Sequence, residues 1–164
     1  MRSLRLQGLA GRPRGFTLIE LAVVLALLGA ILLAVIPRLS IFEEAAFRSD
    51  ARKIASLIRR LDDAAASSKS YYRMTFDIGG NTLIAQKSFD NALFESPEGM
   101  PARVLLGRTT GITGLAQGGT TRSEGTASVL FAPGGAEPFS ISLESSGFSC
   151  TVSYNPYSGK IRII

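Results

Sequence analysis

One acidic residue, Glu20, lies inside the most apolar stretch of the sequence. Residues 16–36 hold 21 amino acids, and Glu20 is the only charged one among them. A carboxylate in the interior of a bilayer costs roughly 2.5–3.5 kcal/mol, so such a residue is a candidate for function. The cost falls when a cation lies nearby in a region of low dielectric constant. The chemistry open to Glu20 is therefore to pair with a buried cation.

The Gly15-Phe16 junction, at the start of the apolar stretch, can supply that cation. A cut there would remove a segment with four arginines and leave 149 of the 164 residues, with a new α-amino group on Phe16. In a straight helix Glu20 lies about 6 Å along the axis from Phe16, so it would reach its own amine poorly and a neighbouring chain's amine well. The alternative is a buried Glu20 that local backbone donors satisfy, or that snorkels toward the interface.

The apolar segment has the length of a membrane span. As a helix, residues 16–36 would reach about 30 Å, which matches the hydrocarbon core of a bilayer. The arginine-bearing residues 1–15 come before it, so the positive-inside rule places the N-terminus in the cytoplasm and the rest of the chain outside. We therefore expect a basic leader at 1–15 and a membrane-spanning half-helix at 16–37.

The next segment, residues 38–68, has the apolar periodicity of an amphipathic helix. We expect one helix to run from Phe16 to about Ser67, with Pro37 bending or loosening it. Its second half, chiefly 50–66, should pack on the chain's own globular domain. The apolar residues, at steps of mostly three and four, are Leu39, Phe42, Ala46, Phe47, Ile54, Ile58, Leu61 and Ala65.

Residues 69–164 change to strict alternation of apolar and polar side chains, punctuated by glycine and proline turns. This pattern predicts antiparallel strands with one buried face, and an α+β fold in which the helix packs on an antiparallel β-sheet domain. Cys150, Ile161 and Ile163 fall on the apolar face, opposite Lys160 and Arg162. The predicted strands cover 72–78, 82–87, 102–106, 128–132, 139–144, 148–154 and 160–163.

Residues 107–127 are rich in glycine and threonine, with six of each. This composition indicates either a long mobile loop or an irregular hairpin. In either case it could be a surface that contacts a partner or only a tolerated insertion.

Composition excludes several classes of function. The chain has no His and a single Cys, so His-based triads, His-ligated metals and cysteine-cluster sites are excluded. No phosphate loop, dinucleotide fingerprint or acidic calcium loop is present. We therefore expect no cofactor, no metal and no enzymatic activity. The net charge of +5 comes mostly from the leader, because residues 16–164 hold 14 basic and 13 acidic side chains.

The sequence Gly-Phe-Thr-Leu-Ile-Glu-Leu at residues 15–21 resembles the class III leader junction of type IV pilins and type II secretion pseudopilins. The resemblance implies that a prepilin peptidase cuts between Gly15 and Phe16 and N-methylates Phe16. In that family the fifth residue of the mature chain is a glutamate, and Glu20 occupies this place. Pro37 becomes the twenty-second, where many pilins carry a helix-bending proline.

The C-terminal region is similar to the end of GspH/FimT-type minor pseudopilins. The similarity rests on the turn at 129–135 and on Asn-Pro-Tyr-Ser-Gly-Lys-Ile-Arg-Ile at 155–163. It implies a minor subunit near the tip of a type II secretion pseudopilus. Its partners would be other major and minor pseudopilins and the inner-membrane secretion platform. The chain would cross the inner membrane once and place residues 69–164 in the periplasm.

A second interpretation concerns the same C-terminal residues. The stretch Gly159-Lys160-Ile161-Arg162 resembles the glycine-basic-x-basic ending that FimT-like minor pilins use for DNA uptake. Lys160 and Arg162 share one strand face and could meet successive phosphates. The alternative is that the two side chains form an ordinary solvated face. Nucleic acid is thus a partner only under this second interpretation.

Overall fold

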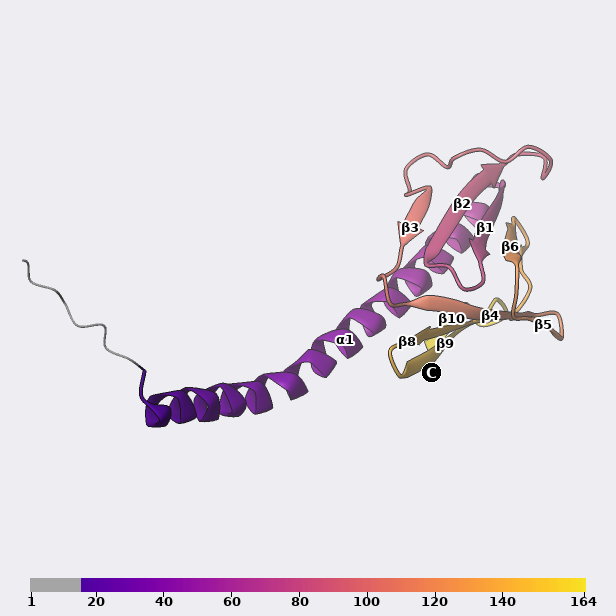
Figure 1. Ribbon diagram of the computed structural model, residues 1–164. Coiled ribbons are helices and arrows are strands. Elements are labelled where there is room, and N and C mark those ends of the chain that lie inside the picture. The colour runs from indigo at the N-terminus through magenta and orange to yellow at the C-terminus, as the bar shows by residue number, and fades with distance from the viewer. Residues whose placement is uncertain (1–15) are drawn as a thin grey trace, which may run out of the picture. The chain divides into compact units, whose positions relative to one another are not determined.

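The computed structural model describes residues 16–164, without the side chains of residues 34–41 (Figure 1). The chain divides into two compact units, Met1–Ser40 and Ile41–Ile164, each described by itself. The expected leader, with Gly15, lies outside the described residues. Figure 1 shows a helix followed by a β-rich domain, which confirms the predicted α+β class.

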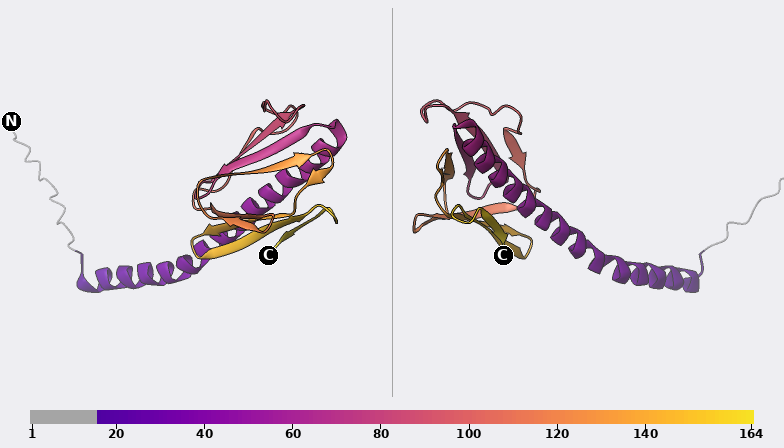
Figure 2. Two further views of the ribbon diagram at one scale, coloured as in Figure 1. Left: turned by 90° about the vertical axis from the view of Figure 1, so that its right-hand side faces the viewer. Right: turned by 180° about the vertical axis from the view of Figure 1, so that it is seen from behind.

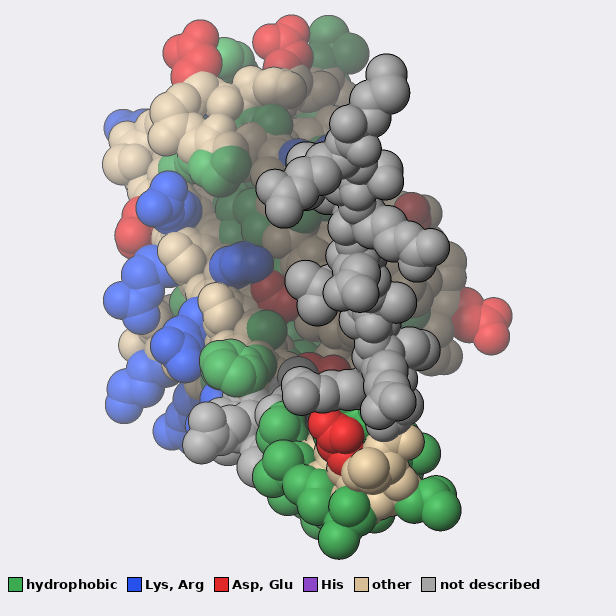
Figure 3. All heavy atoms as spheres, turned by 60° about the vertical axis from the view of Figure 1, so that its left-hand side comes forward, with side chains coloured by type: hydrophobic (Ala, Val, Ile, Leu, Met, Phe, Trp, Pro, Cys, Tyr) green, Lys and Arg blue, Asp and Glu red, His purple; other side chains and the backbone are tan. Residues whose placement is uncertain are grey.

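Helix α1 spans Leu18–Ser68. Thr17 precedes its first turn, and in the first unit the large apolar side chains of residues 16–33 are exposed, with Leu18 88% accessible. Figure 3 shows hydrophobic side chains covering this segment. Over the residues that the structure describes, no helix is long and apolar enough to cross a membrane, and the expected span stays a prediction. The Pro37 side chain lies outside the described residues, so the expected bend also stays a prediction.

In the second unit, α1 buries one face against the β-rich domain, as predicted. Phe42 and Ala46 do not belong to this face: Phe42 is 71% exposed, and the buried stripe begins only at Phe47 because the sheets do not cover the preceding turn. The sequence had limited the expected packing chiefly to residues 50–66, and the buried stripe extends it back to Phe47. The buried apolar residues of α1 are Phe47, Ala51, Ile54, Leu57, Ile58, Leu61 and Ala65.

The strands form two antiparallel sheets, where the sequence had predicted one (Figure 2). The first sheet has the order β3-β2-β1-β6-β7. The second has the order β10-β9-β8-β4-β5. The first sheet comprises β1 Tyr71–Asp77, β2 Thr82–Ser88, β3 Arg103–Leu105, β6 Thr126–Ala132 and β7 Gly135–Ala136. The second comprises β4 Gly111–Gln117, β5 Thr120–Arg122, β8 Phe139–Ser145, β9 Phe148–Asn155 and β10 Lys160–Ile163.

One hydrophobic core joins α1 to both sheets. Alternating residues of β1 and β8 point into it, as the period of two predicts. Phe131 of the first sheet packs edge-on against Phe139 of the second, with ring centroids 6.0 Å apart. Tyr154 lies 5.4 Å from the Phe139 ring, so three aromatic side chains close the space between the sheets.

The segment 107–127 is a hairpin rather than a mobile loop. Strands β4 and β5 pair between Leu115 and Gln117 on one side and Thr120 and Arg122 on the other, around the turn glycines 118 and 119. The register shift between Ile112 and Gly114 accounts for the irregular composition, since a bulge interrupts the alternation there. The hairpin alternative is therefore confirmed.

Two expectations for the second sheet need correction. Ile163 was predicted to be buried but is 45% exposed, because β10 is an edge strand and the core ends beneath β9. Cys150 was predicted to be a buried small side chain but is only half-buried. Lys160 and Arg162 are exposed, as expected for the opposite face.

Candidate functional site

The first candidate site is the start of α1, where Thr17 acts as the N-cap. The backbone N–H of Glu20 donates to Thr17 Oγ1 over 3.3 Å, and the N–H of Leu21 donates to the Thr17 carbonyl over 3.1 Å. Glu20 is thus the third helical residue after a threonine cap, the spacing of a capping box. A carboxylate at this position also interacts favourably with the positive end of the helix dipole.

These hydrogen bonds hold the backbone of Glu20, from which its carboxylate side chain extends. The first turn of α1 holds its backbone, and its side chain is exposed among exposed apolar neighbours. Phe16, one residue before the cap, is 75% exposed. The structure therefore leaves the Glu20 side chain and Phe16 both exposed at the start of the helix. Pairing of Glu20 with the amine of a cleaved Phe16 stays a prediction.

The second candidate site is a groove of about 460 Å³ on the outer face of the second sheet. Lys160 pairs with Asn155 and Arg162 with Ser153 across the β9–β10 ladder, so both cations stand on the outer face of the edge strand. The Ser140 and Ser153 hydroxyls lie 3.4 Å apart in the groove. The lining includes Gln117, Ser140, Ser153, Asn155, Lys160 and Arg162.

Chemically, this groove is mixed. Apolar side chains, among them Phe139 and Tyr154, contribute more of its surface than the hydroxyl and amide groups do, and two neighbouring cations line the edge. Residues two apart on a strand lie about 7 Å from each other, so the two charges can contact one extended polyanion at two points. Binding of DNA by Lys160 and Arg162 stays a prediction.

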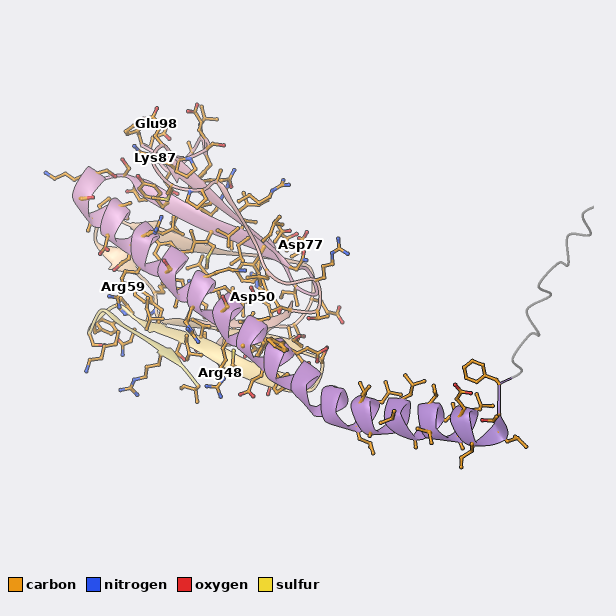
Figure 4. All side chains as sticks on the ribbon, turned by 90° about the vertical axis from the view of Figure 1, so that its left-hand side faces the viewer. Arg48, Asp50, Arg59, Asp77, Lys87 and Glu98 are labelled. Carbon is orange, nitrogen blue, oxygen red and sulfur yellow. The ribbon has the colours of Figure 1, made fainter. Side chains whose placement is uncertain are left out.

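The sequence pattern did not predict the burial of one carboxylate, Asp50. It is 2% exposed, and Figure 4 shows it on α1 within the second unit. Its Oδ2 accepts hydrogen bonds from the Gly107 N–H over 2.7 Å and from Thr110 Oγ1 over 2.8 Å, and Lys53 Nζ lies 2.6 Å from Oδ1. Burial alone raises the pKa of Asp50, but the hydrogen bonds from Lys53, Gly107 and Thr110 outweigh it and leave the pKa below its usual value. The sequence held one signal for this burial. Asp50 lies three residues after Phe47 and four before Ile54, so helical periodicity places it on the apolar stripe.

With the geometry established, two comparisons identify the fold. Residues 11–36 match the family model described as the prokaryotic N-terminal methylation motif. A solved structure of the minor pseudopilin EpsH from the type 2 secretion system of Vibrio cholerae superposes with a TM-score of 0.60 at 13% identity, over 73% of this chain and 95% of that chain. A second structure of the same protein gives 0.59 at 14% identity, over 75% and 97%. The fold is that of a minor pseudopilin.

This pseudopilin fold confirms the type IV pilin-like character expected from the sequence. The methylation motif implies processing by a prepilin peptidase and assembly with other pilin-like subunits. The structural neighbours are pseudopilins, which are structural subunits rather than enzymes. A search of the curated proteins gave no match in sequence.

Asp50 has a structural role in this pseudopilin fold. It ties α1 to the segment between β3 and β4 through Gly107 and Thr110. Because the segment leads directly into the second sheet, the carboxylate helps to fix that sheet against the helix. In the residues that the structure describes, every buried side-chain nitrogen or oxygen has a hydrogen-bond partner.

Proposed function

We propose that the protein is a minor pseudopilin, a structural subunit near the tip of a type II secretion pseudopilus that supports export of folded proteins across the outer membrane. The observation that carries the proposal is the N-terminal methylation motif at residues 11–36, joined to a globular unit with the pseudopilin fold. The partners are a prepilin peptidase, the other major and minor pseudopilins and the inner-membrane secretion platform.

The apolar half of α1 suits both the membrane-inserted subunit and the subunit assembled in a fibre. Its large side chains at residues 16–33 are exposed on all sides of a single chain. A helix that is apolar all round is stable in lipid, and equally stable in a bundle of similar helices. Passage from the inner membrane into a fibre therefore exchanges one apolar environment for another at small net cost. The globular unit stays in the periplasm throughout.

The Glu20 carboxylate sets the register of the assembly. Cleavage between Gly15 and Phe16 creates an N-methylated amine at Phe16, and the carboxylate of a neighbouring subunit pairs with it. A buried polar pair specifies one alignment among many apolar ones, because every other alignment leaves a charge without a partner. Pro37, twenty-one positions after Phe16, is expected to bend or loosen the helix after its apolar half.

Mass spectrometry of the chain purified from fibres tests the processing. The expected N-terminus is N-methylated Phe16, with residues 1–15 absent. Fibres built from chains that retain the leader would overturn the proposal.

Replacement of the carboxylate tests the register. We expect Glu20→Ala to be cleaved and methylated normally, because the scissile bond is unchanged, yet to be lost from sheared fibres. Thr113→Ala, an exposed substitution on β4, is the matched control and should enter fibres like the wild type. Normal incorporation of Glu20→Ala would contradict the register argument.

A second candidate function is favoured by the basic groove. Under it the protein is a FimT-like minor type IV pilin that captures DNA for natural transformation, and Lys160 and Arg162 contact phosphates along the edge strand. The supporting observation is that both side chains are exposed on one face and line the same groove.

Duplex DNA binding by the detergent-solubilised full chain separates the two functions. Under the second function, binding falls steeply with salt, and the Lys160→Ala, Arg162→Ala double variant lowers the slope of log K against log salt by about 2. Arg108→Ala, an exposed arginine before β4, is the control and should leave the slope unchanged. Absence of binding at low salt would remove this candidate.

A further inference from the structure

Strand β10 forms a free edge of the second sheet, because β9 is its neighbour on one side only. At the end of this ladder Ile164 and Thr151 exchange two backbone hydrogen bonds, of 2.8 and 3.0 Å. Such exchanges alternate along an antiparallel pair, so every second residue of β10 bonds to β9. The backbone N–H and C=O groups of Ile161 and Ile163 therefore point away from β9. They form an open row of donors and acceptors along the edge.

A groove of about 350 Å³ lies beside the end of this edge, between β10 and α1. Its base is apolar: Phe47 of α1 and Phe148 of β9 stack with their ring centroids 6.3 Å apart, and Cys150 lies next to them. Ile163 lines the same groove and is 45% exposed, although it lies on the core side of β10. A further strand beside β10 would cover this side chain, because alternate residues of that strand would face the groove.

Cations lie on both sides of this edge. Lys160 and Arg162 stand on the outer face of β10, and Figure 4 shows Arg48 and Arg59 on the side of α1 toward the second sheet. Arg48 is neutralised by Glu44, at 2.7 Å. Among the residues that the structure describes, Lys160, Arg162 and Arg59 take part in no ion pair.

Acidic groups near the edge leave its outer face basic. Asp62 accepts a hydrogen bond from the Tyr154 hydroxyl, and Asp63 lies nearby. Tyr154 points into the core, so these carboxylates lie on the opposite side of the sheet from the two β10 cations. The terminal carboxylate of Ile164 stands in the wall of the groove, two residues beyond Arg162. It repels an acidic occupant at that end, and so confines the acidic positions to the level of the two cations.

This charge pattern selects the kind of strand that can pair with β10. Lysine and arginine on an edge discourage pairing with like strands, and two copies of β10 would set cation against cation. Opposite charges across a ladder are favourable instead. An occupant therefore needs acidic residues beside Lys160 and Arg162. At the alternate positions, beside Ile161 and Ile163, it needs apolar residues.

We propose that β10 receives an extended segment of a partner protein, in which acidic and apolar residues alternate, as an additional antiparallel strand. The edge joins an open row of backbone groups to cations on its outer face and to an apolar groove on its core side. The ladder hydrogen bonds supply affinity, and the side chains select the sequence. The inference uses only the second unit, so its failure would leave the proposed function standing.

Binding of a synthetic peptide in which aspartate and valine alternate tests the strand pairing. The full chain is held in lipid nanodiscs, and fluorescence anisotropy measures the affinity. In the proposed ladder the valine N–H groups face β10, and the aspartate N–H groups face away from it. N-methylation of the valine amides should therefore weaken binding about tenfold, since backbone hydrogen bonds are lost. N-methylation of the aspartate amides is the matched control and should leave binding nearly unchanged.

Charge reversal tests the selectivity of the edge. The Lys160→Glu, Arg162→Glu double variant should bind the aspartate peptide about tenfold more weakly than wild type does. It should instead bind a peptide in which lysine and valine alternate, and this gain shows that the variant is folded. The control with the same change of charge is Arg103→Glu with Arg122→Glu, two exposed arginines on β3 and β5. It should bind the aspartate peptide like wild type.

The proposal fails if the two N-methylated peptides bind with equal affinity, because the contact then does not use the backbone of β10. It also fails if the charge-reversed variant gains no affinity for the lysine peptide. Binding of duplex DNA at Lys160 and Arg162, without binding of the aspartate peptide, would overturn it as well, since the two cations would then serve the second candidate function.

Discussion

The Gly107 backbone N–H donates to the Asp50 carboxylate over 2.7 Å, linking two residues 57 positions apart. Asp50 lies on the buried face of α1, and Gly107 lies in the segment between β3 and β4. Thr110 completes the cluster with a second bond to the same oxygen. A charged acceptor that satisfies two donors stabilises this crossing more than a neutral side chain would. The helix and the second sheet are therefore joined by polar contacts as well as by the core.

Removing this carboxylate should destabilise the globular unit. Asp50→Ala leaves the Gly107 N–H and the Thr110 hydroxyl without their acceptor, which we expect to cost about 2–3 kcal/mol in the free energy of unfolding. Urea unfolding of the Ile41–Ile164 unit measures it. Asp77→Ala is the control, because the exposed Asp77 carboxylate accepts a hydrogen bond from Thr126 Oγ1 at the surface, and a loss below about 1 kcal/mol is expected. Equal losses from the two variants would contradict the role given to Asp50.

The same carboxylate should make stability depend on pH. Its pKa is lowered in the folded state from an ordinary value of 3.8, so the unfolded chain takes up its proton at a higher pH than the folded chain does. The stabilisation is then complete above about pH 5 and is lost as the pH falls through the lowered folded pKa. We expect the difference in stability between wild type and Asp50→Asn to be largest near neutral pH and to shrink below about pH 4. A difference that stays constant from pH 7 to pH 3 would exclude this linkage.

Local periodicity predicted most of the elements but not their arrangement. The alternation in β1, β8 and β9 is visible in the sequence because one face of each strand is buried. β4 was not assigned, since Gly111, Gly114 and a bulge break the pattern in a strand that pairs on both sides. The division into two sheets depends on long-range pairing, such as Met74 with Val129, which no local pattern encodes.

The candidate sites differ in how far the sequence could predict them. Lys160 and Arg162 were assigned to the outer face because strand alternation decides that directly. Asp50 was hidden among the charged residues of α1, and its partners, Gly107 and Thr110, lie in a stretch whose composition indicates a loop. The exposure of Ile163 was missed for a different reason, because alternation predicts the side of a strand and not whether the core extends beneath it.

Gly107 should be sensitive to the smallest substitution. A Cβ at this position would lie 2.9 Å from Asp50 Oδ2, too close for an undisturbed contact. The carboxylate is held by three partners and cannot retreat freely, so we expect Gly107→Ala to lower the free energy of unfolding by about 1–3 kcal/mol. Gly134→Ala is the matched control, since nothing lies within 4 Å of its Cβ, and it should be nearly neutral. If the two variants unfold at the same urea concentration, the space between Gly107 and the Asp50 carboxylate accepts a methyl group, and the inferred close contact is wrong.

Thr17 should govern the first turn of α1 and, through it, the position of the Glu20 carboxylate. Its hydroxyl accepts the Glu20 N–H over 3.3 Å, and Thr17→Val removes that acceptor while keeping the shape of the side chain. Loss of an N-cap costs about 1 kcal/mol, which corresponds to about fivefold faster amide exchange at Glu20 when the chain is held in detergent micelles. Thr17→Ser keeps the hydroxyl and should keep the protection. If the valine and serine variants exchange equally fast, the cap does not order this turn, and the carboxylate must be positioned by the neighbouring subunit alone.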